Sequence, residues 1–312
     1  MKGFLAWSKD EHFSHPATFR RYKTSSKALL RYFGITRLDK ITPESVERYK
    51  SVRLAQFATV RSKEPGKRKQ TNRKIKPATV NRELACLRAV FNNVIKGDVP
   101  LKNPVSKTGA KALQEDNEQV RVLTFEEEKK YLAVATPLLR DVASIMLETG
   151  MRPEEVYRIR PENLNLTGGW IFNPYGKTKA ARRRVPLNSA AKHVLMRRLN
   201  DLKTPYIFPC ETDDRRPVPK VNNAHDRAVK ASGVAPFRLY DLRHTWATRA
   251  AESGTDLITL AALLGHSKIQ MVLRYAHPSQ EHQARAVERM ERFVLEQRFK
   301  FEERNPHGVG TC

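Results

Sequence analysis

The chain has 312 residues, of which 40% are hydrophobic, and this length favours two domains with separate cores. Its 58 Lys and Arg against 33 Asp and Glu give a formal charge of +25, which favours a polyanionic partner such as nucleic acid over an acidic or neutral one. We expect a soluble protein without membrane contact, because no apolar run approaches the roughly 18 residues needed to span a membrane. Cys86, Cys210 and Cys312 are far apart and form neither a disulfide framework nor a zinc motif, which fits the cytoplasm.

The first hundred residues predict a small bundle of three helices. Apolar residues recur there at three- and four-residue steps, and no alternating strand pattern is present. Gly34 should end the first helix, Thr42 with Pro43 should begin the second, and Gly97 should end the third. The inner faces predicted for the three helices are, in order, Phe19, Tyr22, Leu29, Leu30 and Phe33; Val46, Tyr49 and Val52; and Val80, Leu84, Leu87, Phe91 and Val94.

A dense basic segment lies between the second and third predicted helices. Because so much charge cannot be buried, we expect a mobile basic arm. It is either a solvated loop or, beside a DNA-handling domain, a set of phosphate contacts, and the second use is favoured. Its basic members are Arg61, Lys63, Lys67, Arg68, Lys69, Arg73, Lys74 and Lys76.

The polar stretch 113–119 predicts a linker between a helical domain at 1–112 and a second domain at 120–290, with a C-terminal tail at 291–312. Thr124 and Glu127 form a capping box that begins the second domain. Helices dominate this domain, but 170–172 and 184–187 predict two short strands around a loop at 175–183.

Two segments of the second domain offer cations to a phosphodiester. In Thr149-Gly150-Met151-Arg152-Pro153, the glycine can end one helix and the proline can begin the next, which places Arg152 at a tight corner. In Gly176-Lys177-Thr178-Lys179, a lysine at the tip of a hairpin can reach a departing oxygen. Taken alone, each segment is weak evidence for a phosphodiester site, because an arginine at a corner more often forms a surface ion pair and a lysine in a turn is more often solvated.

Two further segments carry aromatic and imidazole groups. Tyr240-Asp241-Leu242-Arg243-His244-Thr245 begins a helix and presents Tyr240 and Arg243 on one side. A helix then stops at Gly265, His266 takes the corner, and Ser267 is predicted to cap a helix that bears Tyr275 two turns later. The alternative for this tyrosine is that Met271, Leu273 and Tyr275 form a buried core face.

In this order, the motifs T-G-x-R, G-K-T, L-R-H-T-x-A-T, L-G-H-S and R-Y-A-H resemble the catalytic domain of the tyrosine recombinase, or phage integrase, family from about Val120 to His277. The preceding helices resemble the core-binding domain of that family. The resemblance implies a mainly α fold with a small antiparallel β-sheet. It consists of an N-terminal helical, SAM-like core-binding domain and an α+β catalytic domain.

The resemblance also implies roles for single residues. Arg152 and Arg243 would clamp the scissile phosphate, because planar guanidinium groups suit its nonbridging oxygens and oppose the charge that develops on them. Lys177 would protonate the leaving 5′-oxygen and His266 would donate to the phosphate. Tyr275 would be the nucleophile. Glu155 lies where the family often has a supporting acidic residue.

Two of these assignments stay open. The family usually has His where this chain has Tyr240, and a phenol with a pKa near 10 is a poor base at neutral pH. Tyr240 is therefore a hydrogen-bond donor to the phosphate at most, and water, His266 or the substrate would take the proton of the nucleophile. Lys179 is the alternative to Lys177 as the acid if the hairpin turn is shorter.

The resemblance implies a site-specific recombinase or integrase of a mobile element that cuts and rejoins DNA through a 3′-phosphotyrosyl intermediate, with no cofactor, metal or ATP. Its expected partners are double-stranded DNA, other copies of the chain up to a tetramer, and accessory DNA-bending proteins. The apolar tail would dock either on a neighbouring protomer or on its own domain. A type IB topoisomerase and a noncatalytic DNA-binding regulator are the alternatives. A preceding arm-binding domain is expected to be absent or limited to residues before Ser14.

Overall fold

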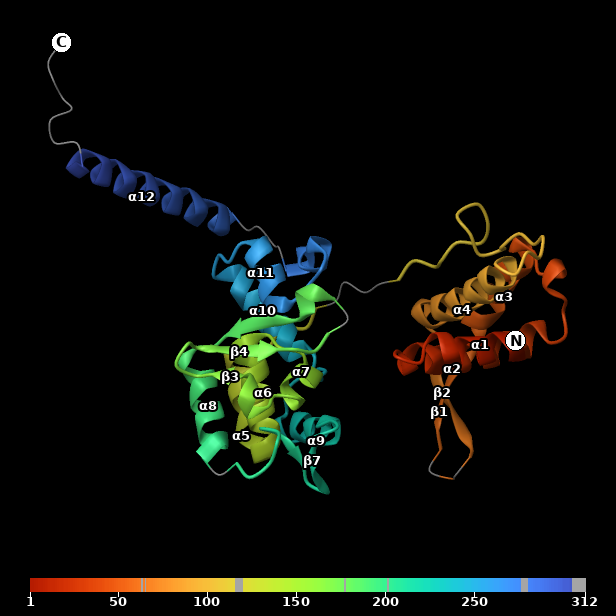
Figure 1. Cartoon of the computed structure of the whole chain (residues 1–312), viewed down its shortest axis with the longest axis horizontal. Coiled ribbons are helices and arrows are strands. Elements are labelled where there is room, and N and C mark those ends of the chain that lie inside the picture. The colour runs from red at the N-terminus through yellow and green to blue at the C-terminus, as the bar shows by residue number, and fades with distance from the viewer. Residues whose placement is uncertain are drawn as a thin grey trace, which may run out of the picture. The chain divides into compact units, whose positions relative to one another are not determined.

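A computed structural model describes residues 1–62, 64, 66–115, 120–176, 178–200, 202–275 and 280–304. The chain divides into two compact units, Met1–Asn117 and Glu118–Cys312 (Figure 1). Within the described ranges, no helix is long and apolar enough to cross a membrane.

The first unit is a helical bundle whose helices begin and end largely where the sequence predicts. The helices are α1 (Lys2–Glu11), α2 (Pro16–Phe33), α3 (Pro43–Ala55) and α4 (Pro77–Ile95). The predicted stop at Gly34 is confirmed, as is the start after Thr42, whose side chain accepts from the Ser45 amide. Helix α1 was not predicted. Leu30 and Val52 are 45% and 41% exposed, so the assignment of these two residues to inner faces is wrong. The core contains Phe4, Leu29, Val46, Tyr49, Val80, Leu84, Leu87 and Phe91.

The basic segment forms a β-hairpin, so the expectation that the first hundred residues contain helices and no strand is wrong. Strands β1 (Phe57–Arg61) and β2 (Arg68–Lys74) pair antiparallel, with a register shift between Phe57 and Thr59. The hairpin projects from the helices of this unit (Figure 1). Nearly every described side chain of β2 is exposed. A strand that faces solvent on both sides shows no alternation of apolar and polar residues, which is why the pattern gave no signal. Lys63 and Pro65 lie outside the described residues.

A buried ionic cluster joins α3 to α4. The Glu83 carboxylate, 4% exposed, accepts from Arg53 Nη2 at 2.8 Å and from the Tyr49 phenol at 2.6 Å. Burial, together with this carboxylate, raises the pKa of the Tyr49 phenol far above its ordinary value. The two helices are thus held by complementary charge as well as by apolar packing.

The second unit packs eight helices with two small antiparallel sheets among its described residues. Sheet order β3-β4-β5 confirms the two predicted strands and adds a short third, and β6-β7 is a separate pair that was not predicted. The helices are α5 (Phe125–Val134), α6 (Pro137–Thr149), α7 (Pro153–Tyr157), α8 (Ser189–Asn200), α9 (Asn222–Ser232), α10 (Asp241–Glu252), α11 (Leu257–Leu264) and α12 (Gln280–Arg304). The strands are β3 (Leu164–Asn165), β4 (Trp170–Asn173), β5 (Arg183–Pro186), β6 (Pro209–Cys210) and β7 (Asp213–Pro217).

Helix α6 runs through the main core of this unit, and its end positions the site described below. Leu139, Val142, Ile145 and Met146 on this helix are fully buried. A smaller core is built by α10, α11 and the 3₁₀ turns that follow them: Ala247, Leu260, Ala261, Leu264, Val272 and Tyr275.

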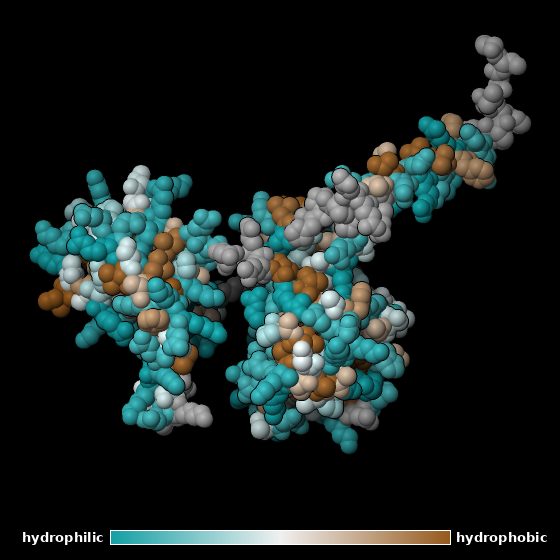
Figure 2. Space-filling model, turned by 180° about the vertical axis from the view of Figure 1, so that it is seen from behind, coloured by the Kyte–Doolittle hydropathy of each residue, from teal (hydrophilic) through white to brown (hydrophobic). Residues whose placement is uncertain are grey.

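Helix α12 crosses residue 290, the boundary that the sequence predicts between the second domain and the C-terminal tail. Apolar side chains are exposed on it, and Figure 2 shows them as brown patches among hydrophilic ones. The exposed apolar residues are Val287, Met290, Phe293, Val294, Leu295, Phe299 and Phe301.

We expect Thr124→Ala to destabilise the second unit by about 1 kcal/mol, because the predicted capping box is present and the change leaves amides at the start of α5 without an acceptor. Thr124 Oγ1 accepts from the Glu127 amide, and the Glu127 carboxylate accepts from the Thr124 amide. The free energy of unfolding in urea measures the effect.

Thr136→Ala is the matched control. Thr136 occupies the same position before α6, but its side chain makes no capping hydrogen bond. Equal losses in the two variants would contradict the role given to the capping box.

Candidate active site

The corner between α6 and α7 positions Arg152, as the sequence predicts. Gly150 ends α6 in the left-handed conformation, with φ +64°. A Cβ at this glycine would lie 2.3 Å from the Trp246 ring, so both the backbone conformation and the close approach of α10 require glycine. Pro153 is the first residue of α7 and Arg152 is its N-cap. The Arg152 side chain is 27% exposed.

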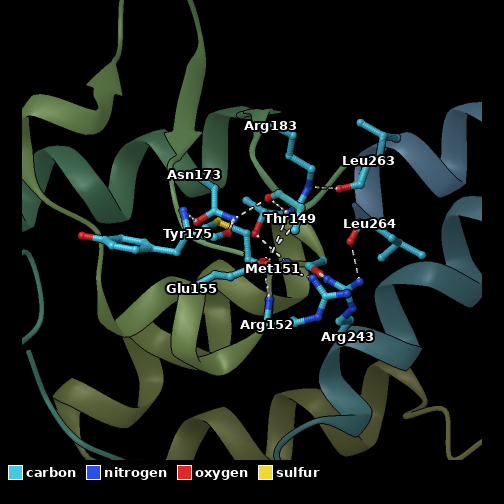
Figure 3. A network of polar contacts seen from close by, with 12 residues as sticks. Thr149, Met151, Arg152, Glu155, Asn173, Tyr175, Arg183, Arg243, Leu263 and Leu264 are labelled. Carbon is cyan, nitrogen blue, oxygen red and sulfur yellow. Dashed lines mark hydrogen bonds and ion pairs between the residues drawn. The ribbon is translucent and has the colours of Figure 1, made fainter. Parts of the chain in front are cut away.

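One buried carboxylate holds two arginines at this corner. Glu155 accepts from Arg152 Nη1 at 2.8 Å and from Arg183 Nη1 and Nη2 at 3.3 and 3.2 Å (Figure 3). Burial alone would raise the pKa of Glu155, but Arg183 and then Arg152 outweigh it, and the net pKa is lowered. Glu155 therefore stays ionised and compensates two cations. Its structural role agrees with the supporting acidic residue implied by the resemblance.

Arg243 braces the ends of two helices from inside the protein. Its side chain is fully buried, and it donates from Nη1 to the Gly150 carbonyl at 2.7 Å and from Nη2 to the Leu264 carbonyl at 2.6 Å. These carbonyls lie at the C-terminal ends of α6 and α11, where helix dipoles favour a cation. Burial, and then the nearby Arg152 charge, lowers the pKa of Arg243 to about 10. Its Nε has no hydrogen-bond partner among the described residues.

His266 is held as a neutral donor. Its Nε2 lies 3.0 Å from Arg243 Nη2, and because a guanidinium can only donate, Nε2 must accept. The ring proton then lies on Nδ1, which is buried and has no partner within the described part of the chain. Burial, and then the Arg243 charge, lowers the pKa of His266 to about 4, so the ring is uncharged at neutral pH. An N–H donor without an acceptor is the group that a phosphate oxygen would satisfy.

A cavity of about 490 Å³ lies beside these groups. Arg152, Glu155 and His266 line it, opposite the loop between β4 and β5. Asn173 fixes that loop, because its Nδ2 donates to the carbonyls of Tyr175 at 3.0 Å and Ala181 at 2.8 Å. The cavity therefore has charged and polar groups on one side, and other residues hold both these groups and the loop in place.

The two candidate acids belong to the same loop. Lys177 lies outside the described residues. Lys179 is exposed at the start of the 3₁₀ turn Lys179–Ala181, whose amide at Ala181 is capped by the Thr178 hydroxyl. The choice between the two lysines stays a prediction.

Tyr275 is buried in this conformation. Its side chain belongs to the smaller core, the residue is 4% exposed, and burial raises the pKa of its phenol to about 12 although Arg243 opposes the shift. Met271 and Leu273 are 44% and 50% exposed, so a buried face shared by all three residues is wrong. The phenol is within the electrostatic influence of both Arg243 and Arg152.

The segment that carries Tyr275 differs from the sequence prediction. Gly265 ends α11 as expected, but Lys268, not Ser267, precedes the next turn, and its side chain does not cap it. Two 3₁₀ turns, Ile269–Met271 and Leu273–Tyr275, replace the predicted α-helix. Val272 and Tyr275 are buried in the smaller core, and this packing sets the conformation of the run. Residues 276–279 lie outside the described residues.

Three aromatic rings form a row along the start of α10. The Tyr240 ring lies 5.2 Å from the His244 ring, which lies 5.7 Å from the Tyr275 ring. The Tyr275 Oη is 2.6 Å from His244 Nδ1. The Tyr240 phenol affects the pKa of both Arg152 and Arg243, which places it beside the predicted clamp.

Sequence reasoning missed two residues of this site. His244 lies four residues after Tyr240, so helical spacing already placed it on the same face of α10. Arg183 stands in the middle of three consecutive arginines, Arg182-Arg183-Arg184, so residue type does not single it out. The alternation of burial along β5 distinguishes it from its exposed neighbour Arg184.

Comparison with known proteins identifies relatives of this arrangement. The profile of the phage integrase family matches residues 95–282. The integrase of Escherichia phage P2 is 30% identical over 217 residues, which cover 68% of this chain and 59% of that protein, so the chain spans less than two thirds of this relative.

Two sets of solved structures share the fold. The Tn1549 transposon integrase (residues 82–397), in complex with circular intermediate DNA, has a TM-score of 0.69 at 20% identity, covering 92% of this chain and 98% of that one. A lambda integrase tetramer bound to a Holliday junction has a TM-score of 0.67 at 20% identity, covering 88% and 77%. The mainly helical fold with small antiparallel sheets that the sequence predicts is thus confirmed.

We expect Glu155→Ala to lower the free energy of unfolding of the second unit by about 3–5 kcal/mol, because it leaves the buried Arg183 uncompensated. The pKa of Glu155 is lower in the folded state than in the unfolded state. Its contribution to the free energy of unfolding is therefore fully present above the unfolded-state pKa, and it is lost as the pH falls through the folded-state pKa. The stability difference between wild type and variant should therefore shrink on acidification, as measured by urea unfolding from neutral to acidic pH.

Glu154→Ala is the control for this change, since the neighbouring Glu154 is exposed. A pH-independent difference between wild type and Glu155→Ala would contradict the assigned ion pairs.

Proposed function

The chain belongs to the phage integrase family, and on that premise we propose that it is a site-specific recombinase that cuts and rejoins DNA for integration or excision of a mobile element. The covalent intermediate would be a 3′-phosphotyrosine on Tyr275. That bond conserves the energy of the broken strand, so the reaction we propose uses neither ATP nor a metal. The reaction would take place in the cytoplasm.

The observation that carries this proposal is the set of unused donors around the cavity. Arg243 Nε and His266 Nδ1 are buried without a partner among the described residues, and Arg152 lines the cavity next to His266. Buried donors without acceptors are uncommon in folded proteins. A phosphodiester group supplies oxygen acceptors, and its negative charge would offset the positive charge that Glu155 leaves uncompensated among Arg152, Arg183 and Arg243.

Each group then has a role that its chemistry supports. Arg152 and Arg243 would hold the nonbridging oxygens and stabilise the charge that grows as phosphorus becomes five-coordinate. His266 would donate its Nδ1 proton to the same group. Lys177, with Lys179 as the alternative, would protonate the 5′-oxygen as it leaves. Tyr240 would donate to the phosphate from beside the clamp.

The proposal requires a change at Tyr275. The phenol is buried against His244 and is not among the residues that line the cavity, so it cannot attack from its present position. We propose that binding of DNA moves the 3₁₀ segment and brings the phenol to the phosphorus. Such a step would make cleavage depend on DNA-induced rearrangement.

We propose that the first unit binds double-stranded DNA and uses the β1–β2 hairpin for phosphate contact. The hairpin exposes Lys69, Arg73 and Lys74, and of its described residues only Glu64 is acidic. Solved structures that share the fold contain DNA, and one is a tetramer on a Holliday junction. We extend this proposal to self-association as a tetramer, in which the exposed apolar residues of α12 would contact a neighbouring protomer. Accessory DNA-bending proteins would take part in the same assembly.

We expect the wild-type chain to form a covalent adduct with a nicked suicide substrate that carries its target site, and Tyr275→Phe to form none. The reason is that only the phenol supplies the attacking oxygen. Denaturing gels measure the adduct, and joined product distinguishes a recombinase from an enzyme that only relaxes supercoils. Binding by both proteins without any adduct would favour the noncatalytic regulator instead.

We expect replacement of Lys69, Arg73 and Lys74 by Gln to weaken DNA binding and to reduce the slope of log K against log salt by up to about 3, since each lost phosphate contact contributes about 0.9. Fluorescence anisotropy over a salt series measures both quantities.

Glu64→Gln provides a control of opposite sign. It removes the carboxylate that pairs with Lys67 at 2.6 Å, so it should leave the slope unchanged or increase it. A triple variant with the wild-type slope would show that the hairpin does not contact phosphate.

A further inference from the structure

We propose that His244 is the group that takes the phenolic proton of Tyr275 during strand cleavage. The inference rests on the proposed function and adds a residue for which the motif resemblance implied no role. It answers a question raised by the sequence, because Tyr240 stands where the family usually has a histidine and is itself a poor base.

The geometry places acceptor and nucleophile in direct contact. His244 Nδ1 lies 2.6 Å from the Tyr275 oxygen, and both residues are buried. His244 is the fourth residue of α10, one position after Arg243, so the same helix turn fixes the proton acceptor and one arginine of the clamp. The movement of the 3₁₀ segment proposed above must therefore keep the Tyr275 oxygen within hydrogen-bond reach of His244 Nδ1, while Arg243 on the same helix turn holds the phosphate beside it.

The protonation states suit this transfer. Burial lowers the pKa of His244 to about 4 and raises that of Tyr275 to about 12, so both groups are neutral at pH 7. A phenol is a stronger acid than a neutral imidazole N–H, and it therefore donates to Nδ1. At a pKa of 12, only about one phenol in 10⁵ is ionised at pH 7, and unassisted attack is correspondingly slow.

DNA itself would make His244 a better base. After burial, the charges that act on its pKa are Asp241, which raises it, and Arg274, Arg238 and Arg243, which lower it. Phosphates that bind to these arginines would reduce their effect and raise the pKa of His244, although burial, the largest cause, would still hold it below its ordinary value. His244 would thus be a stronger base in the DNA complex than in the free enzyme.

The step balances in atoms and charge. As the Tyr275 oxygen bonds to phosphorus, its proton passes to the lone pair on His244 Nδ1. The bond from phosphorus to the 5′-oxygen breaks, and that oxygen keeps the electron pair and receives a proton from the loop lysine. In the rejoining step, the 5′-hydroxyl attacks phosphorus and gives its proton back to the loop lysine. The bond from phosphorus to the Tyr275 oxygen breaks, and His244 returns its proton to the departing phenolate.

The experiment measures single-turnover cleavage of the nicked suicide substrate by the full chain from pH 5.5 to 9. For His244→Gln and His244→Ala, we expect rates about 10²–10⁴-fold lower at pH 7, the range that one general base contributes. These rates should rise with pH as the phenol ionises, and added imidazole should partly restore His244→Ala. A substrate with a bridging 5′-sulfur, which leaves without a proton, should rescue Lys177→Ala but not either His244 variant.

His225→Gln is the matched control for loss of a buried histidine–tyrosine contact. His225 Nδ1 lies 2.8 Å from the Tyr131 phenol, and Nε2 lies 2.9 Å from the Phe237 carbonyl, in the main core of the same unit. It should lower stability while keeping the wild-type pH profile. His244 variants that cleave at the wild-type rate or faster, with the wild-type profile, would overturn the inference and leave His244 as a restraint on Tyr275. Absence of any Tyr275-dependent adduct from wild type would instead refute the proposed function.

Discussion

The second unit depends on the assembly of like charges at one largely buried place. Arg152, Arg183 and Arg243 converge there, and each would be driven apart or deprotonated without compensation. Glu155 supplies the compensating negative charge to the first two, and the carbonyl ends of two helices supply partial negative charge to the third. The resulting site retains more positive charge than its own groups neutralise. This remainder is what an incoming phosphate would cancel.

Helix α10 organises the site around that charge. It presents Tyr240 at its N-cap, Arg243 one turn later and His244 beside it, and its Trp246 closes against the glycine that ends α6. Burial makes the two histidines of the site weak bases and Tyr275 a weak acid. In the resting site, the positive charge for binding a phosphate is thus in place, but the site does not react, since its nucleophile keeps its proton and is inaccessible.

Much of this arrangement could be predicted from local sequence signals. Gly150, Gly265 and Thr124 mark helix ends through backbone conformation and capping, which depend on only a few neighbouring residues. The β1–β2 hairpin was missed because both of its faces are solvated, and the partners of Arg183 and His244 were missed because they come from distant segments. The turns before Tyr275 depart from the predicted helix for the same reason, as packing of Val272 and Tyr275 against α10 and α11 decides their conformation.

The placement of Arg243 between two helix ends also limits how the protein can change in length. An α-helix advances by about 100° per residue, so one residue added to α6 or α11 would turn its last carbonyl away from the guanidinium. Both helices therefore have a fixed phase as well as a fixed length. We expect added residues to be tolerated in segments that do not contact Arg243, such as the short turn between β6 and β7. The architecture can thus diversify at its periphery while the distance between its two helix ends stays constant.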